Sequence, residues 1–244
     1  MSGSAALALR LLETCLLGLG VVVGLGLVAR GGPAAAASNG PGSKPLTPSE
    51  EAKAVLLTQA DMPSGWVATP VGKGPTHIAP LSETMARCIR VSSSVATVKP
   101  LKVSSPDFTA PDHTAAVEDS ASVYATVAQA SAAYKAMANR RTPSCMASLG
   151  AAALQTSIEA EAGHGAVVDS ISIGPLATGS LPAHETGFNV HIPLTLHGKN
   201  LTIDSTQVDF QRGAVLQQLT FNGNGAPFTP LEQVHLLQIA TGHP

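Results

Sequence analysis

The residues of this sequence that could do chemistry are its eight histidines, three cysteines and scattered serines and acids. Nucleophilic catalysis by serine requires a serine, a histidine and an acid brought together in space, and α/β-hydrolases place the serine in a G-x-S-x-G turn. The sequence contains no G-x-S-x-G and none of the glycine-rich motifs that bind nucleotide phosphates. We therefore predict that the protein is not an enzyme and uses no cofactor.

The histidines do not have the spacing of a metal site. Neither H-E-x-x-H nor H-x-H occurs in the sequence. His191 and His197 share one side of an expected strand, but at about 3.3 Å per residue they lie roughly 20 Å apart in a straight strand. We expect histidines that face solvent or occupy turns, and no bound metal.

Cys88 and Cys145 are the two cysteines outside the apolar N-terminal segment, and 57 residues separate them. Cysteines of exported proteins usually pair, because the compartment is oxidising. A structural disulfide between Cys88 and Cys145 is therefore the prediction. The alternatives are two buried free thiols or a redox pair, although the C-x-x-C of redox proteins is absent.

The N-terminal segment indicates export. Residues 16–29 form an uninterrupted apolar run of 14 residues, with Arg30 after it and an alanine run beyond. This length is typical of a signal peptide, whereas residues 5–29 would reach the length of a membrane anchor if Arg10 and Glu13 were included. Residues 1–37 are predicted to be a signal peptide or a membrane anchor, and in the second case residues 5–29 would associate with the membrane.

Either interpretation places the rest of the chain outside the cytoplasm, secreted or anchored to the cell membrane. Residues 38–47, rich in glycine, proline and serine, are predicted to be a flexible linker, and residues 48–244 a single domain. The net charge is −2 and no block of basic residues occurs. Nucleic-acid binding needs a basic surface, so nucleic acid is excluded as a partner.

The order of the expected elements favours an α+β fold. Thr-Pro-x-Glu at residues 47–50 and again at 229–232 has the residues of a helix N-terminus, and Thr142-Pro143 starts another helix. Residues 67–80 are expected to be a loop, and residues 95–103 and 116–126 to be strands. A four-stranded meander follows residue 166. We predict an antiparallel sheet packed against helices.

Two irregularities are expected within that meander. Pro193 interrupts an otherwise regular alternation of apolar residues over 184–196, which predicts an edge strand or a bulge. In the next strand the apolar residues change from odd positions, such as Ile203, to even positions, such as Val208. A bulge near Ser205 would produce that change of phase.

Several of these segments together resemble a known family. Residues 56–66, LLTQADMPSGW, resemble the LLT-x-x-DLP-x-GW opening of exported actinobacterial sensor-domain proteins. Cys88, the S-A-S-V-Y of residues 120–124 and the P-S-C ending at Cys145 continue the likeness. Over about residues 50–242 the chain is similar to the extracytoplasmic sensor domain of a mycobacterial serine/threonine protein kinase. The resemblance implies two disulfides, of which only one has its cysteines here, and a non-catalytic sensing role.

The resulting prediction is a non-catalytic exported domain that binds an unidentified ligand or protein of the cell envelope. The weak ligand-binding candidates are Trp66, Asn189 and His191, and Trp66 has the alternative role of a core anchor. The alternative functions are an envelope lipid carrier, which would need a large apolar pocket, and a small exported hydrolase, which would need a serine or aspartate within hydrogen-bonding reach of a histidine in a cleft.

Overall fold

The computed structural model describes residues 46–71, 76–77, 82–162, 166–176, 185–224 and 228–242. The predicted signal peptide or anchor over residues 1–37 and most of the linker lie outside the described residues, so those assignments stay predictions. Within the described ranges, no helix is long and apolar enough to cross a membrane.

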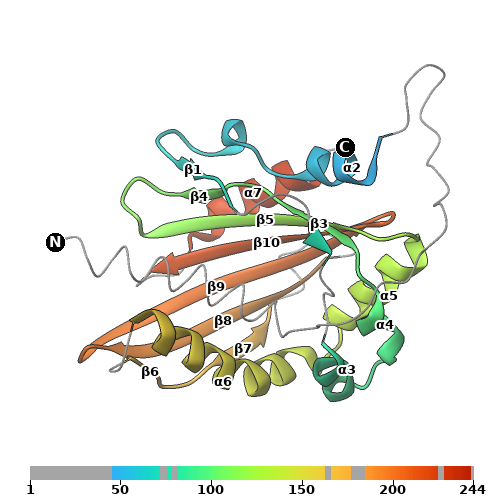
Figure 1. Cartoon of the computed structure of the whole chain (residues 1–244). Helices are drawn as coiled ribbons and strands as arrows, with labels where there is room; N and C mark the ends of the chain where they lie inside the picture. The colour runs from blue at the N-terminus through green and yellow to red at the C-terminus, as the bar shows by residue number, and fades with distance from the viewer. Residues whose placement is uncertain are drawn as a thin grey trace.

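The described residues form one antiparallel sheet of ten strands, in the order β1-β4-β5-β10-β9-β8-β6 (Figure 1). Strand β3 also pairs with β5, β2 pairs with β3, and β7 pairs with β8. Strands β7 to β10 pair consecutively, which is the predicted meander. The strands are β1 (Val67–Thr69), β2 (Thr76–His77), β3 (Leu101–Ser104), β4 (Asp107–Thr109), β5 (Ala115–Val123), β6 (Ala166–Val168), β7 (Ser172–Pro175), β8 (Glu185–Leu196), β9 (Lys199–Arg212) and β10 (Val215–Asn224).

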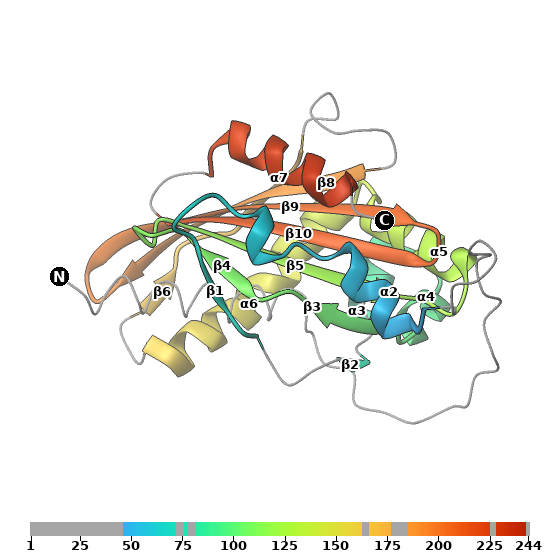
Figure 2. The ribbon, with the colours of Figure 1, turned by 90° about the horizontal axis from the view of Figure 1, so that it is seen from above.

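Helices cover both faces of this sheet. Helices α2 and α7 lie on one face, which we call the first face, and α3 to α6 lie on the opposite, second face (Figures 1 and 2). The predicted α+β fold with an antiparallel sheet packed against helices is confirmed. The helices are α2 (Pro48–Val55), the 3₁₀ turn η1 (Gln59–Asp61), α3 (Glu83–Ile89), α4 (Ser93–Thr97), α5 (Val127–Met137), α6 (Thr142–Ala162) and α7 (Pro230–Gly242).

The helices begin where the sequence supplies a side chain to cap them. The side chain of Thr47 accepts a hydrogen bond from the N–H of Glu50, whose own carboxylate accepts one from the N–H of Thr47, so a complete capping box starts α2. The N–H of Glu232 donates to Thr229 in the same way at the start of α7. Thr126 caps α5. These caps satisfy N–H groups that a helix leaves unpaired in its first turn.

The apolar core of the first face consists of two adjoining groups. Near α7, aromatic rings from three segments meet, with Phe228 in contact with Trp66 and Phe221 at centroid distances of 6.0 and 5.3 Å. Near α2, Ala52, Val55 and Leu56 pack on β3 and β5. With few aromatic residues in the chain, this concentration makes the first face the main core.

The predicted bulge near Ser205 is wrong. Strand β9 pairs with β8 and with β10 in continuous register through that position. The apolar phase changes because the two ends of β9 bury opposite faces. Ile203 packs on the second face with Leu154 of α6, whereas Val208 packs on the first face with the residues around α7.

The prediction that Pro193 marks an edge strand is also wrong, because β8 has neighbours on both sides. Proline has no N–H to donate to a neighbouring strand. It is tolerated at position 193 because the segment between β6 and β7 does not pair with β8 there. The carbonyl of Pro193 still accepts a hydrogen bond from the N–H of Asp169 in that interval. The irregularity therefore lies in the neighbouring chain and not in β8.

Two assignments before residue 105 also differ from the prediction. The segment expected to be a loop over 67–80 contains β1 and β2. The segment expected to be a strand over 95–103 is a short helix, α4, followed by β3. The Ser92 side chain accepts a hydrogen bond from the N–H of Ser94 and so starts the helix, and Pro100 lies directly before β3.

The predicted disulfide is confirmed. Cys88 and Cys145 are bonded, with their Cα atoms 5.9 Å apart, and join α3 to α6. Both lie in a small apolar group with Ala86, Ile89 and Ala136. The bond therefore fastens the segment that includes α3 and α4 to the long helix that covers the second face.

Replacing both cysteines by alanine should reduce the free energy of unfolding by about 4 kcal/mol, because a loop of 57 residues is then no longer closed in the unfolded chain. Urea denaturation of the double variant and the native protein measures the difference. The intact mass of the native protein should rise by two hydrogens on reduction, and two free thiols in freshly exported protein would contradict the assignment.

A buried carboxyl connects α2 to the sheet on the first face. The N–H of Leu57 donates to Asp119 Oδ2 at 2.7 Å, and Gln217 Nε2 donates to the same oxygen at 2.9 Å. Gln217 Nε2 also donates to the carbonyl of Val55 at 2.8 Å. Burial raises the pKa of Asp119 to about 7, while these hydrogen bonds lower it.

The raised pKa gives the stability a pH dependence. Between the ordinary value of 3.8 and about 7, folded Asp119 keeps a proton that the unfolded chain has released. The contribution of Asp119 is fully present below pH 3.8 and is lost as the pH rises to about 7. Asp119→Asn should flatten this fall in the free energy of unfolding, measured by urea denaturation across that range. The exposed Asp169→Asn is the control, and equal slopes in the two variants would contradict the prediction.

Candidate functional site

Trp66, the first of the predicted site residues, lies in the core of the first face. Its side chain is 8% exposed and contacts Phe228, and its carbonyl accepts a hydrogen bond from Gln59 Nε2. These contacts match the alternative role of a core anchor that the sequence left open for this residue.

Asn189 and His191 are exposed on β8. His191 Nδ1 lies 2.7 Å from Asp204 Oδ1, and the histidine side chain is 54% exposed. Asn189 Oδ1 accepts a hydrogen bond from Thr206, whose hydroxyl oxygen in turn accepts one from Gln233 of α7. Both side chains therefore lie on the open part of the first face beside α7.

The structure does not bring the three candidates together. Phe228, just before α7, contacts Trp66, and Gln233 of α7 connects through Thr206 to Asn189. The helix therefore lies between the tryptophan and the two β8 residues. Ligand binding by these three residues stays a prediction.

A different group of polar side chains is buried or half-buried on the second face. We call it the polar belt; it spans three neighbouring strands, between the apolar contacts of α5 and those of α6. Residues paired across strands in it include Ser205 with Asn222, Gln207 with Thr220, and Asp209 with Gln218. The belt consists of Glu118 from β5, Ser205, Gln207 and Asp209 from β9, and Gln218, Thr220 and Asn222 from β10.

Hydrogen bonds within the belt satisfy its carboxylates. Asp209 is 1% exposed and accepts from Gln207 Nε2 at 2.9 Å and from Gln218 Nε2 at 3.0 Å. Glu118 accepts from Asn222 Nδ2 at 3.0 Å. The two acids thus use amide donors from neighbouring strands, which hold the side chains of the belt in fixed directions.

Burial shifts the ionisation of the charged groups at the belt. It raises the pKa of Asp209 to about 6, against the hydrogen bonds from Gln207 and Gln218 and the charge of Lys102, all of which lower it. Burial also lowers the pKa of Lys102 on β3, while the charges of Glu118 and Asp209 raise it. Lys102 lies on β3 opposite Ser122 of β5, the strand that carries Glu118.

Several buried polar atoms on this face have no hydrogen-bond partner within the described part of the chain. Among them are the Oδ1 of Asn222, the Oγ of Ser205 and the hydroxyl of Tyr124, together with Oε1 of Gln129 on α5. Asn222 is 0% exposed, and the side chains of Ser205 and Tyr124 are also buried. Burying a polar group without a partner costs about 1–3 kcal/mol, so such atoms mark places where a bound molecule or ordered water supplies the missing bond.

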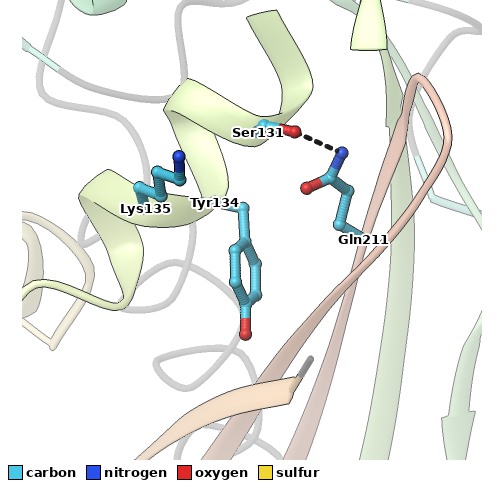
Figure 3. A pocket seen from close by; sticks show the side chains of 4 residues that line it. All are labelled: Ser131, Tyr134, Lys135 and Gln211. Atoms are coloured by element: carbon cyan, nitrogen blue, oxygen red, sulfur yellow. Dashed lines mark hydrogen bonds between the residues drawn. The ribbon is translucent and has the colours of Figure 1, made fainter. Parts of the chain in front are cut away.

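A cavity of about 300 Å³ lies at one end of the belt, lined by Ser131, Tyr134 and Lys135 of α5 and by Gln211 of β9. Gln211 Nε2 donates to Ser131 Oγ at 2.9 Å, while Tyr134 extends between the helix and the strands (Figure 3). Burial, followed by the charges of Asp209 and Glu185, raises the pKa of Tyr134. The cavity therefore continues the polar belt along β9.

The residues of the belt include no histidine or cysteine, and the Oγ of its one serine, Ser205, has no hydrogen-bond partner within the described residues. Within the described ranges, no three histidine, cysteine, aspartate or glutamate side chains lie close enough to hold a metal ion.

Sequence reasoning missed this site although its pattern is visible. From Gln207 to Gln211 of β9 and from Gln218 to Asn222 of β10, polar residues alternate with apolar ones. That pattern predicts a sheet with one solvated face. Only the fold shows that the polar face is buried as well.

No family model and no curated protein matches the chain. Among solved structures, the crystal structure of the extracellular domain of PknH from Mycobacterium tuberculosis covers 83% of this chain and 100% of its own length, with 10% identity and a TM-score of 0.39. It belongs to the class of domain that the sequence motifs resemble.

A matched pair of serine variants tests whether Ser205 is unpaired. Ser205→Ala should raise the free energy of unfolding by about 1 kcal/mol, since it removes a buried hydroxyl that has no partner in the described structure. Ser105→Ala should lower it by about 1 kcal/mol, because the buried Ser105 hydroxyl donates to the carbonyl of Pro106 at 2.7 Å. Urea denaturation of both variants without added ligand measures the difference, and a loss of stability in Ser205→Ala would contradict the assignment.

Proposed function

We propose that this chain is an exported, non-catalytic domain that binds a polar ligand of the cell envelope at the end of the polar belt. The observation that carries the proposal is the cavity of about 300 Å³ beside α5, whose lining of serine, tyrosine, lysine and glutamine side chains offers hydrogen-bond donors and acceptors. A sensing role for this site agrees with the resemblance of the sequence motifs.

The disulfide supports a location outside the cytoplasm, because bonds of this kind persist in oxidising compartments. Whether residues 5–29 remain attached to the membrane stays a prediction from the sequence.

The hydrolase alternative has one observation in its favour. His191 and Asp204 lie within hydrogen-bonding distance, which is part of the arrangement that such an enzyme needs. His191 and Asp204 lie opposite each other on β8 and β9, and the histidine side chain is exposed. The cross-strand pairs on either side of them are Asn189 with Thr206 and Pro193 with Thr202. A water-excluding cleft is what makes such a pair catalytic, and the described cavity is on the other face of the sheet. We therefore place this alternative second.

The lipid-carrier alternative requires an apolar cavity. On the second face, the apolar side chains of β8 are already packed against Leu154 of α6, and the described cavity is lined by serine, tyrosine, lysine and glutamine. A belt of amides and carboxylates would leave its polar groups unpaired against an acyl chain. A polar ligand fits this surface better.

Native mass spectrometry of the full-length exported protein tests the proposal. We expect an additional non-covalent mass that is released on denaturation, present in Ser105→Ala and reduced in Gln211→Ala, which removes a side chain that lines the cavity. Because Ser105→Ala is the variant expected to be less stable than the native protein, retention of the mass in it separates binding from folding. Protein that is consistently empty would contradict ligand binding at the cavity and favour a partner-protein role.

A further inference from the structure

The fold brings two pairs of arginines, about 50 residues apart in the sequence, to one corner of the second face. One pair lies at the C-terminal end of α3, and the other lies in the turn between α5 and α6. In that turn, Asn139 Nδ2 donates to the carbonyl of Ile89, the last residue of α3, at 3.2 Å, and the disulfide joins the same two segments. We call the four residues the arginine cluster; they are Arg87, Arg90, Arg140 and Arg141.

The charges of the arginine cluster are not compensated by the protein. Three of the four side chains are exposed, and Arg141 is half-buried. Within the described ranges, no carboxylate forms an ion pair with any of the four guanidinium groups. The acid of α3, Glu83, is in the first turn of that helix, at the opposite end from Arg90. In a chain whose net charge is −2, this corner therefore carries a local excess of positive charge.

Local structure accounts for only one of these arginines. Arg87 lies in the last turn of α3, where the helix dipole favours a cation. Arg140 and Arg141 lie beyond the last turn of α5 and directly before α6, whose N-terminal end disfavours a cation. Arg90 has a φ of 61°, in the left-handed region that favours glycine and asparagine. An anion bound at this corner would supply the interaction that the fold itself does not.

The shape of this corner indicates the kind of anion. No residue of the arginine cluster lines the described cavity, so the guanidinium groups are displayed on exposed helix ends. A guanidinium group donates two parallel hydrogen bonds to one phosphate, and it is more weakly hydrated than an ammonium group. Four such groups on an open surface match an extended array of phosphates better than one small enclosed anion.

The arginine cluster lies at the same end of the sheet as the start of the described domain. Figures 1 and 2 both show α2, which begins at Pro48, at the end of the sheet where α3, α4 and α5 lie. The apolar segment that is predicted to associate with the membrane precedes α2, and the linker over residues 38–47 extends at most about 35 Å. A domain attached through this linker therefore has the arginine cluster within reach of the membrane surface.

We propose that the arginine cluster docks the domain on the anionic phospholipid head groups of the membrane outside the cytoplasm. The guanidinium groups donate hydrogen bonds to lipid phosphates, and the positive end of the α6 dipole adds to the attraction. Docking sets the end of the sheet with α3 and α5 against the membrane and points the hairpin between β8 and β9 away from it (Figure 1). This inference goes beyond the proposed function and does not depend on the cavity.

Labelling of arginines by phenylglyoxal, read out by mass spectrometry, tests the docking on the full-length protein in vesicles. One set of vesicles holds phosphatidylglycerol and phosphatidylcholine in equal parts, and the other holds phosphatidylcholine alone. We expect the arginine cluster to be labelled several-fold more slowly in the anionic vesicles. Sodium chloride at 1 M should remove the difference, because the screening length falls to about 3 Å. Arg212, which donates to the carbonyl of Ala240, is the internal control and should be labelled equally in both.

A matched pair of variants connects the protection to the arginine cluster. Arg90→Asn removes one charge and places a residue that suits a φ of 61°, so the urea midpoint should not fall. It should lower the ratio of docked to free domain by about fivefold, the factor expected for one basic residue at an anionic membrane surface. Lys199→Asn removes the same charge from the β8–β9 end of the sheet and should leave the protection unchanged. Equal effects of the two variants would contradict a specific docking surface.

The remaining outcomes distinguish the membrane from other anions. Equal labelling in the two kinds of vesicle, or equal protection by inorganic phosphate in the presence of phosphatidylcholine vesicles, would contradict docking on anionic lipid. Protection by soluble polyglutamate but not by phosphatidylglycerol would replace the membrane with an acidic protein partner and overturn the proposal. None of these results bears on the cavity, which native mass spectrometry tests separately.

Discussion

Strand β9 must bury apolar side chains on opposite faces of the sheet at its two ends, and much of the structure follows from this constraint. Its N-terminal half places Ile203 against α6, while its C-terminal half places Val208 and Phe210 against α7. Because the strand stays in continuous register, every second side chain after Ile203 points to the second face, beyond the apolar contact with α6. Ser205, Gln207 and Asp209 are these side chains, and they form the centre of the polar belt.

Two carboxyl groups are buried in this fold, and each accepts hydrogen bonds from amide groups. Asp119 on the first face and Asp209 on the second are each held by glutamine amides from neighbouring strands, with Gln217 and Gln218 adjacent in β10 and pointing to opposite faces. Burial raises the pKa of both acids, and amide donors limit the rise. Asp119 is tied to backbone groups beside α2 and is structural, whereas Asp209 lies among side chains that have unused hydrogen-bonding capacity.

This difference separates architecture from site. Around Asp119, the N–H of Leu57 and the carbonyl of Val55 take part in the hydrogen bonds and fix the N-terminal segment on the sheet. In the belt, the hydrogen bonds of Asp209 come from side chains of neighbouring strands, and the belt ends at the polar cavity beside α5. Unpaired buried oxygens occur in both places, on Gln217 beside Asp119 and on Ser205 and Asn222 in the belt. The disulfide strengthens the surrounding frame, because it joins α3 to the helix that packs on the second face.

The sequence by itself determined the features that depend on local chemistry. Capping side chains placed the starts of α2 and α7, the compartment rule paired Cys88 with Cys145, and alternation in the meander predicted β8 to β10. Only the tertiary structure decided that β9 has no bulge, that Pro193 lies inside the sheet and that Trp66 is in the core. Only the tertiary structure also showed that the polar sides of β9 and β10 are buried. Periodicity reports which side chains share a face, whereas burial depends on what segments distant in the sequence place over that face.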